Sequence, residues 1–245
     1  YTSMEWKTSI SGIENDKTLI KGVPLTELAI QYSFVDNIYF ILTGKRATPE
    51  IERVLNVLFS LSLDHGVGVV STLASRIATS ADVPLQQSLI AALASMGHAH
   101  GGATEDAAFW FQGMVTKKKG AKEAVQEAFE SGRKIPGYGH SVVGHDDRVA
   151  TLFKVARELK LYGQYCQFAC DVEQAIGEEK KKKIPLNIDG GIAALVLDLD
   201  IPASLATGLF IIGRIPGLLA HREEEKSQHN GLRRLPESDV EYRAH

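Results

Sequence analysis

The sequence has little of several residue types whose abundance would mark a special class of protein. Among its 245 residues are only two cysteines and eight prolines, and 27 basic residues nearly balance 30 acidic ones to give a formal net charge of −3. Two cysteines cannot build the disulfide framework of a small secreted domain. A nearly balanced charge gives no reason to expect nucleic acid or a membrane surface as a partner. Because 44% of the residues are hydrophobic, we expect a stable globular core.

The two cysteines and the start of the chain indicate a cellular location. Cys166 and Cys170 are four residues apart in a segment with helical spacing, which favours two small buried thiols over a disulfide and indicates a reducing compartment. We expect no run of apolar residues as long as the roughly 18 residues that a membrane-spanning helix needs. The opening YTSMEWKTS lacks the charged-then-apolar order of a signal peptide. We therefore predict a cytoplasmic protein that does not cross a membrane.

The spacing of apolar residues predicts an all-α fold. Between residues 6 and 25, polar and β-branched residues alternate around Gly12 and Gly22. This alternation predicts one or two short extended segments, which are too short to form a sheet. Ser71 and Thr72 are expected helix starts. We expect the glycines at 44, 66, 101 and 102 to end helices or to form tight turns. After residue 25 the pattern is helical, with apolar residues three or four positions apart in segments 25–44, 49–66 and 71–102. A second helical set covers 104–115, 122–134, 148–160 and 165–183. The segments 190–199 and 202–226 are the most apolar part of the chain, and we expect them at the centre of the core or at an interface.

Two glycine-flanked segments present histidines. His65 stands beside Gly66 at an expected helix end, where a capping or core histidine is the simpler interpretation. His98 and His100 precede a glycine pair, but side chains two residues apart on a helix point in different directions. No zinc-binding partner motif accompanies them. We therefore expect no metal site, and a single functional His100 with the glycines allowing close approach of a ligand.

A turn-rich loop and an apolar helix present two further candidates. His140 lies in the loop 135–147, eight residues before Arg148, and a plain Pro-Gly turn is the alternative interpretation. Asp189 stands at the mouth of an apolar segment, next to a pair of glycines. It is expected either to cap a helix or to act as a general base whose basicity is tuned by apolar surroundings.

Arginines near the end of the chain suggest an anionic ligand. Arg214 lies inside an otherwise apolar segment, where a guanidinium is costly unless it meets an anion, so it predicts contact with a carboxylate. Arg233 and Arg234 have a simpler interpretation as part of a solvated tail.

Taken in order, the segments DHG, HGGA, PGYGH with a following Arg, NID and GR resemble the active-site segments of the citrate synthase family. The similarity runs from about Trp6 to Tyr242 and includes an ISxI-type start. It implies an all-α homodimer in which each subunit has a large helical domain, residues 1–102 and 191–245. A smaller helical lobe, residues 103–190, would close over substrates bound in the cleft.

The resemblance also implies a role for each candidate residue. Asp189 matches the base that removes a proton from the acetyl-CoA methyl group, and His100 matches the histidine that hydrogen-bonds the thioester oxygen. His140 matches the residue that polarises the oxaloacetate carbonyl. The carboxylates of oxaloacetate would be held by His65, Arg148, Arg214 and Arg234 of the partner subunit. We expect no metal and no bound cofactor, since the CoA thioester is itself a substrate.

Departures from the synthase pattern favour one subgroup. The stretch LNIDGG and the ending GLRRLPESDVEY are closer to citryl-CoA lyases and to the C-terminal domain of ATP-citrate lyase, and Gly144 stands near where synthases carry a phosphate-binding arginine. We therefore expect an enzyme that cleaves or forms the carbon-carbon bond between acetyl-CoA and oxaloacetate, within tricarboxylic acid cycle chemistry.

Several alternatives to this activity stay open. One is a citrate or 2-methylcitrate synthase, which also hydrolyses the acyl-CoA intermediate. Another is a non-catalytic subunit that binds CoA or a carboxylate. A separate partner enzyme that forms citryl-CoA is compatible with the first interpretation. Lys180 to Lys183 are interpreted as a solvated helix end, with contact to CoA phosphates as the alternative.

Overall fold

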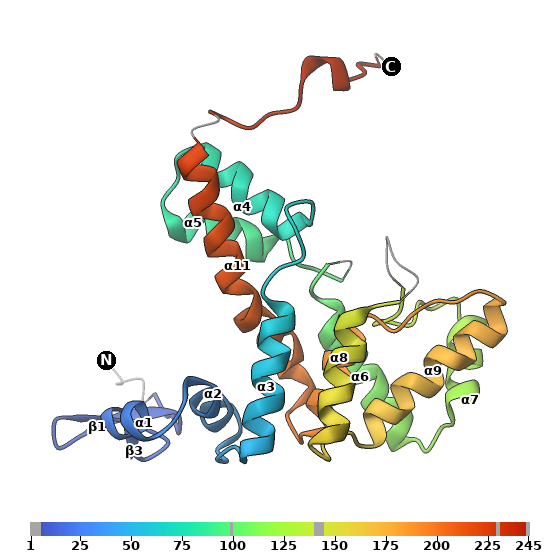
Figure 1. Cartoon of the computed structure of the whole chain (residues 1–245), viewed down its shortest axis with the longest axis horizontal. Helices are drawn as coiled ribbons and strands as arrows, with labels where there is room; N and C mark the ends of the chain where they lie inside the picture. Colours follow the sequence, from blue (N-terminus) through green and yellow to red (C-terminus); the bar gives the residue numbers. More distant parts are fainter. Residues whose placement is uncertain (1–5, 99, 140–144, 229–230, 244–245) are drawn as a thin grey trace, which may run out of the picture. The chain divides into compact units, whose positions relative to one another are not determined.

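A computed structural model of the chain describes residues 6–98, 100–139, 145–228 and 231–243, and helices dominate it (Figure 1). The all-α prediction is confirmed, since the strands within the described residues are confined to one short sheet before residue 25. The chain divides into two compact units, residues 1–57 and 58–245. The division into a large domain and a lobe spanning 103–190 stays a prediction.

The first unit begins with a small antiparallel sheet, so the expectation that these segments could not form one is wrong. Strands β1 (Ser11–Glu14), β2 (Lys17–Ile20) and β3 (Val23–Pro24) pair in sequence order. Two-residue turns join them, and both residues of each turn have positive φ, 49° and 59° in the first turn and 47° and 82° in the second. Such turns match the natural twist of paired strands, which is why strands this short can form a hairpin.

Helices follow the sheet, and their ends carry ordinary signals. They are α1 (Leu25–Gln31), α2 (Phe34–Thr43) and α3 (Pro49–Ser62), the last of which runs into the second unit. The Ser33 hydroxyl caps α2 by accepting the Asp36 N–H at 3.1 Å. Gly44 ends α2 in the left-handed conformation with φ of 77°, as expected.

The second unit holds the remaining helices. They are α4 (Val70–Ser80), α5 (Leu85–Ala94), α6 (Ala103–Thr116), α7 (Ala121–Glu130), α8 (Asp147–Glu158), α9 (Gln164–Lys180), α10 (Ile188–Asp198) and α11 (Ala206–Gln228), with short 3₁₀ turns η1 (Ala203–Leu205) and η2 (Glu237–Asp239). The segment 71–102 is not one helix, because Pro84 stands between α4 and α5 and cannot continue the helix before it. The predicted starts at Ser71 and Thr72 are one or two residues late, since α4 begins at Val70.

Helix α10 forms the centre of the second unit, as the apolar sequence predicted. It packs against α6, α8, α9 and α11, and its residues from Gly190 to Leu197 are all buried. Helices α4 and α5 pack against each other and against α11, as Figure 1 shows. The mouth of the central helix, where Asp189 lies, is therefore held by several neighbours.

The segment Ala203–Gln228, which contains α11, is long and apolar enough to cross a membrane by length and composition alone. The expectation that no apolar run reaches this length is therefore wrong. Core helices of soluble proteins meet the same criterion, and α11 buries Arg214, Arg222 and Glu225. Glu225 pairs with Arg76 and Arg214 donates to the Ser62 carbonyl, so these buried charges have protein partners, as in a helix packed inside a fold.

The two cysteines form no disulfide, as predicted, but only one of the two predicted buried thiols is fully buried. Cys166 and Cys170 are both free and both lie on α9, Cys166 buried and Cys170 half-buried. Burial raises the pKa of each thiol, so both are poor nucleophiles.

Candidate active site

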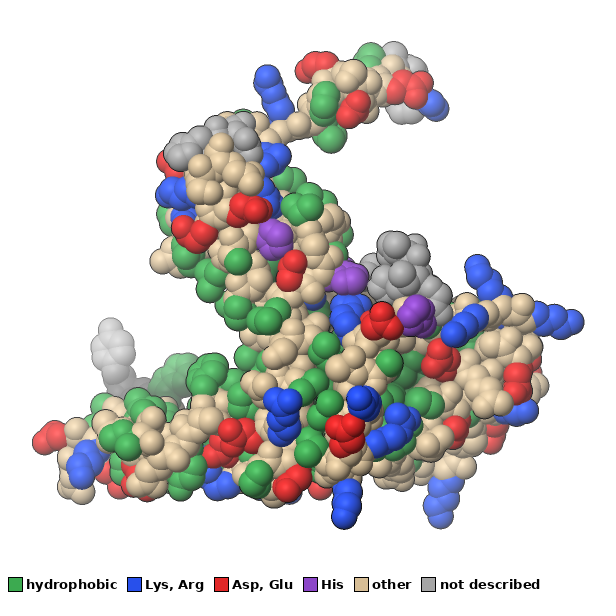
Figure 2. Space-filling view, viewed as in Figure 1, with side chains coloured by type: hydrophobic (Ala, Val, Ile, Leu, Met, Phe, Trp, Pro, Cys, Tyr) green, Lys and Arg blue, Asp and Glu red, His purple; other side chains and the backbone are tan. Residues whose placement is uncertain are grey.

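A cavity of about 260 Å³ in the second unit brings together five of the seven predicted site residues. Histidine, basic and acidic side chains lie near one another in a hollow of the face drawn in Figure 2. Helix ends and loops far apart in the sequence supply the lining. It consists of His65, Val69, His100, Gly101, Gly139, Arg148, Asn187, Ile188, Asp189, Phe210 and Arg214.

The other two predicted residues are not in this lining. His140 lies outside the described residues, although its neighbour Gly139 lines the cavity. Arg234 lies in the exposed C-terminal segment and does not line the cavity. Its predicted role, acting in the site of a partner subunit, stays a prediction.

Asp189 lies in the first turn of α10, with its carboxylate held from a neighbouring helix. The buried hydroxyl of Thr104 in α6 donates to Asp189 Oδ1 at 2.7 Å. Asn187 performs the capping role that Asp189 was alternatively expected to have, because Asn187 Oδ1 accepts the Gly190 N–H at 3.2 Å. The carboxylate of Asp189 is therefore available to a ligand in the cavity.

His100 is held in a defined protonation state. The Ser71 N–H lies 3.3 Å from His100 Nε2 and the Ser71 hydroxyl lies 2.8 Å from it. Since a backbone N–H can only donate, Nε2 is an acceptor and the neutral ring carries its proton on Nδ1. Burial lowers the pKa of His100, the charge of Arg214 lowers it further, and Asp189 opposes both. His100 is thus neutral near pH 7, with an Nδ1–H to donate.

Arg214 presents a buried positive charge to the cavity. Its side chain is only 2% exposed, its Nε donates to the Ser62 carbonyl at 2.7 Å at the end of α3, and its Nη1 finds no hydrogen-bond partner among the described residues. Burial lowers the pKa of Arg214, because a charge taken out of water is destabilised. Because Arg214 also lines the cavity, an anion bound there would stabilise this charge.

Arg148 is fixed by two hydrogen bonds to Asp146, which lies two residues earlier in the sequence. Its Nε and Nη2 donate to the two oxygens of Asp146 at 2.9 and 2.7 Å. Asp146 also accepts the Ile188 N–H at 3.0 Å, which ties it to the start of α10. Burial acts to raise the pKa of Asp146, but the hydrogen bonds and charge of Arg148 outweigh it and lower the pKa. The guanidinium therefore reaches the cavity in a set orientation.

His65 enters the cavity from the turn after α3. The preceding residue, Asp64, accepts the Gly66 N–H at 2.9 Å and pairs with His221 of α11 at 3.2 Å. Gly66 has φ of 87°, so the expectation of a tight glycine turn is confirmed. These contacts give the turn a fixed shape against α11.

A close approach of backbone holds the loop that precedes His140 against α10. The Asn187 N–H donates to the Gly137 carbonyl and its side-chain Nδ2 donates to the Gly139 carbonyl, both at 3.0 Å. A Cβ on Gly190 would lie 2.5 Å from Leu186 Cδ1 and 2.6 Å from the Gly137 oxygen. Gly190 is therefore needed for the loop to pass the end of the helix.

We expect Gly190→Ala to destabilise the fold by about 1–3 kcal/mol, as overpacking does. Gly191→Ala is the matched control on the same helix, because the three atoms nearest to its Cβ would all belong to the side chain of Val149, the first of them at 3.1 Å. Chemical denaturation of both variants measures the difference. Equal stability of the two would show that the loop does not depend on this contact.

The described residues hold no group of three or more His, Cys, Asp and Glu side chains arranged to bind a metal. The absence of a metal and of a bound cofactor stays a prediction. The lysines at the end of α9 lie elsewhere, since Lys181, Lys182 and Lys183 line a separate surface groove of about 490 Å³ with Cys170 and Glu173.

The sequence matches the description "citrate synthase, C-terminal domain" over residues 21–235, which is most of the chain. The chain belongs to the citrate synthase family. The predicted family and fold are therefore confirmed.

Among solved structures, the citryl-CoA lyase from Hydrogenobacter thermophilus is 39% identical with a TM-score of 0.92, covering 98% of this chain and 95% of that one. A Methanosaeta concilii ATP citrate lyase in complex with (3S)-citryl-CoA is 25% identical with a TM-score of 0.88, covering all of this chain and 42% of that one. These matches confirm the predicted subgroup within the citrate synthase family.

The curated relatives that match this chain are longer proteins. A probable ATP-citrate synthase of Dictyostelium discoideum is 29% identical over 96% of this chain. The chain spans about 40% of the length of this relative. It therefore corresponds to one part of such citrate synthase family members.

Proposed function

We propose that this chain is a citryl-CoA lyase-type enzyme that cleaves citryl-CoA to acetyl-CoA and oxaloacetate, or joins them. The observation that carries the proposal is the grouping of Asp189, a neutral His100 and the incompletely partnered Arg214 around one small cavity. Similarity to a citryl-CoA lyase over nearly the whole length of both chains supports it. A cavity of about 260 Å³ is smaller than the roughly 300–1,000 Å³ of drug-sized pockets, which suits a small dicarboxylate with CoA lying mostly outside.

The chemistry needs a proton-transfer group and an oxygen-stabilising donor acting together. In the cleavage direction the citryl hydroxyl gives its proton to His140, the predicted partner of this oxygen, while the carbon-carbon bond breaks and its electron pair forms the acetyl-CoA enolate. The Nδ1–H of His100 donates to the enolate oxygen, and Asp189 in its acid form gives a proton to the methylene carbon. In the joining direction the Asp189 carboxylate removes that proton. His140 remains the predicted partner of the oxaloacetate carbonyl oxygen.

Cationic side chains hold the dicarboxylate. Arg214 and Arg148 face the same cavity as His65, and guanidinium groups bind carboxylates by paired charged hydrogen bonds. Arg234 of the partner subunit completes the set in a homodimer. The enzyme is cytoplasmic, uses the CoA thioester as substrate without a bound cofactor, works within tricarboxylic acid cycle chemistry, and draws citryl-CoA from a separate enzyme that forms it.

A synthase that also hydrolyses the thioester is the second candidate, because the same groups catalyse the carbon-carbon step in both directions. A non-catalytic binding subunit is less consistent with the site, since such a protein has no need of a held carboxylate next to a neutral histidine donor. The three candidates differ in their products.

Purified protein should release oxaloacetate from citryl-CoA without releasing free thiol. Oxaloacetate is followed by its reduction in a coupled assay and thiol by a colorimetric reagent over the same time course. Rapid thiol release with citrate formed from acetyl-CoA and oxaloacetate would instead identify a synthase. If neither assay detected a product while acetyl-CoA and oxaloacetate still bound to the protein, the non-catalytic subunit would be favoured.

A further inference from the structure

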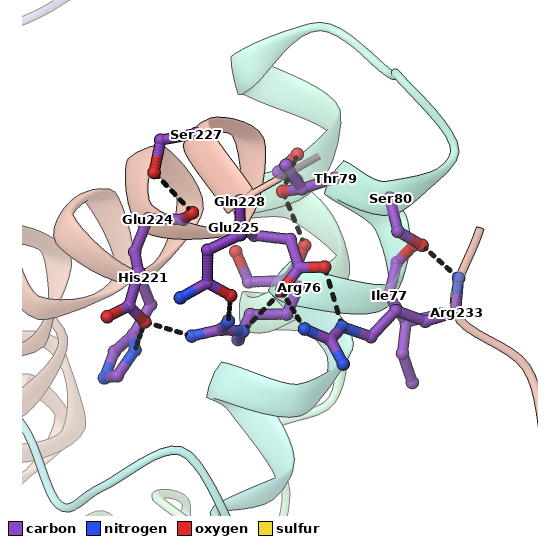
Figure 3. A network of polar contacts seen from close by, with 12 residues as sticks. Arg76, Ile77, Thr79, Ser80, His221, Glu224, Glu225, Ser227, Gln228 and Arg233 are labelled. Atoms are coloured by element: carbon purple, nitrogen blue, oxygen red, sulfur yellow. Dashed lines mark hydrogen bonds and ion pairs between the residues drawn. The ribbon is translucent and has the colours of Figure 1, made fainter. Parts of the chain in front are cut away.

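A buried carboxylate joins two helices at the far end of α11. Glu225 on α11 is 3% exposed, and Arg76 on α4 is 6% exposed. Arg76 Nε donates to Glu225 Oε2 at 2.6 Å, while its other nitrogens contact Glu224 and, at 3.1 Å, Gln228 (Figure 3). A buried carboxylate needs such a partner, because an unpaired charge in the interior is strongly unfavourable.

The same carboxylate holds the residue that precedes Arg234. Arg233 donates from Nε to Glu225 Oε1 at 2.6 Å and from Nη2 to Oε2 at 2.8 Å. Its backbone N–H donates to the Ser80 hydroxyl at the end of α4 at 2.9 Å (Figure 3). The side chain and the backbone of Arg233 are therefore both fixed, and a forked contact of this kind also sets orientation.

The rest of the C-terminal segment is exposed. Leu232, Leu235, Val240 and Tyr242 are between 56% and 88% exposed. Arg243 pairs with Glu241 two residues away, and η2 is closed by its own backbone bonds. These bonds are local, whereas the contacts of Arg233 join the segment to α4 and α11.

We propose that Glu225 and Arg233 form an anchor that sets where the C-terminal segment leaves the helices and so positions Arg234 for its carboxylate. The anchor acts through Arg234, so Glu225 and Arg233 are positioning residues. The inference rests on the proposed function, in which Arg234 holds a carboxylate of oxaloacetate in a neighbouring subunit. Displacing a binding group by about 1 Å can cost up to about a hundredfold in rate.

The test uses Arg233→Ala, because Arg233 is 41% exposed and its loss leaves Arg76 paired with Glu225. We expect this variant to raise the KM for oxaloacetate about tenfold with kcat little changed. Arg233→Lys should restore part of the effect, since one charged donor remains. Arg243→Ala, which removes another arginine of the same segment, is the matched control and should leave KM unchanged.

A double-variant cycle separates positioning from independent binding. If Arg233 acts through Arg234, the variant lacking both arginines should be no worse than Arg234→Ala alone. Fully additive losses would overturn the inference.

Chymotrypsin cleavage after Leu232 gives a readout that does not depend on activity, and it should accelerate in Arg233→Ala. Unchanged cleavage together with unchanged KM would also overturn the anchor. An unchanged KM in Arg234→Ala would instead refute the proposed role of Arg234, and the cleavage rate would still report on the anchor.

Discussion

Replacing Asp189 by Asn is expected to lower kcat for the carbon-carbon step about a thousandfold while leaving oxaloacetate binding largely intact. Proton transfer by a positioned side chain contributes about 10²–10⁴ in rate, and the amide cannot perform it. Asn keeps the size of the side chain and an oxygen that can accept from Thr104, whose hydroxyl lies 2.7 Å from Asp189 Oδ1. The loss would therefore report on chemistry and not on packing. Steady-state kinetics and calorimetric binding of oxaloacetate measure the two effects.

Asp198→Asn is the matched control, since Asp198 lies at the other end of the same helix. Its carboxylate accepts the N–H groups of Gly163, Tyr165 and Cys166, each at 2.9 Å, and so caps α9. This variant should lose stability by about 1 kcal/mol, as weakened caps do, and keep its kcat. A kcat within tenfold of the parent in Asp189→Asn would remove Asp189 from the proton transfer.

The residues of the cavity could be predicted where their local sequence is unusual for a helical protein. Arg214 stands in an apolar stretch and Asp189 stands beside two glycines at the start of a strongly apolar segment. The first pattern is costly in a plain core, so the sequence alone indicates an anion at Arg214. For Asp189 the sequence leaves two interpretations open, a helix cap or a general base. The folded chain brings both residues to one cavity.

The supporting contacts could not be predicted, because they join residues that are distant in sequence. Ser71 meets His100 across 29 residues, and Thr104 meets Asp189 across 85. A serine or threonine in a helical segment carries no sign of its distant partner, and Ser71 by itself indicates only a helix start. Asp146 is different: it lies two residues before Arg148, so its pairing could have been expected from the sequence.

The helices of the fold follow from apolar spacing, but their breaks and the sheet do not. The spacing of apolar residues continues across Pro84, although the proline separates α4 from α5. Pairing of β1 with β2 depends on two successive residues with positive φ, Asn15 and Asp16. Asn and Asp tolerate that conformation, so the turn is visible in principle, whereas strand length alone argues against a sheet.

Replacing Arg214 by Gln is expected to raise the KM for oxaloacetate and for citryl-CoA about thirtyfold or more. Truncating one partner of a buried charged pair costs about 2–5 kcal/mol in binding, and Arg214 is 2% exposed with one nitrogen unpartnered among the described residues. In the ligand-free protein that charge is unfavourable, as the lowered pKa of Arg214 shows. The free energy of unfolding of the variant should therefore stay within about 1 kcal/mol of the parent or increase. Replacing a binding residue that destabilises the fold often increases stability.

Arg222→Gln separates the role in binding from the general effect of losing a buried arginine. Arg222 lies on the same helix eight residues further on, is 9% exposed, and also has a nitrogen without a partner among the described residues, but it does not line the cavity. We expect Arg222→Gln to leave both KM values unchanged. Kinetics and denaturation of the two variants side by side decide the matter. If the KM values of Arg214→Gln were equal to those of Arg222→Gln, carboxylate binding by Arg214 would be refuted. A large loss of stability in Arg214→Gln alone would show instead that its main role is to cap the Ser62 carbonyl at the end of α3, 2.7 Å from Arg214 Nε.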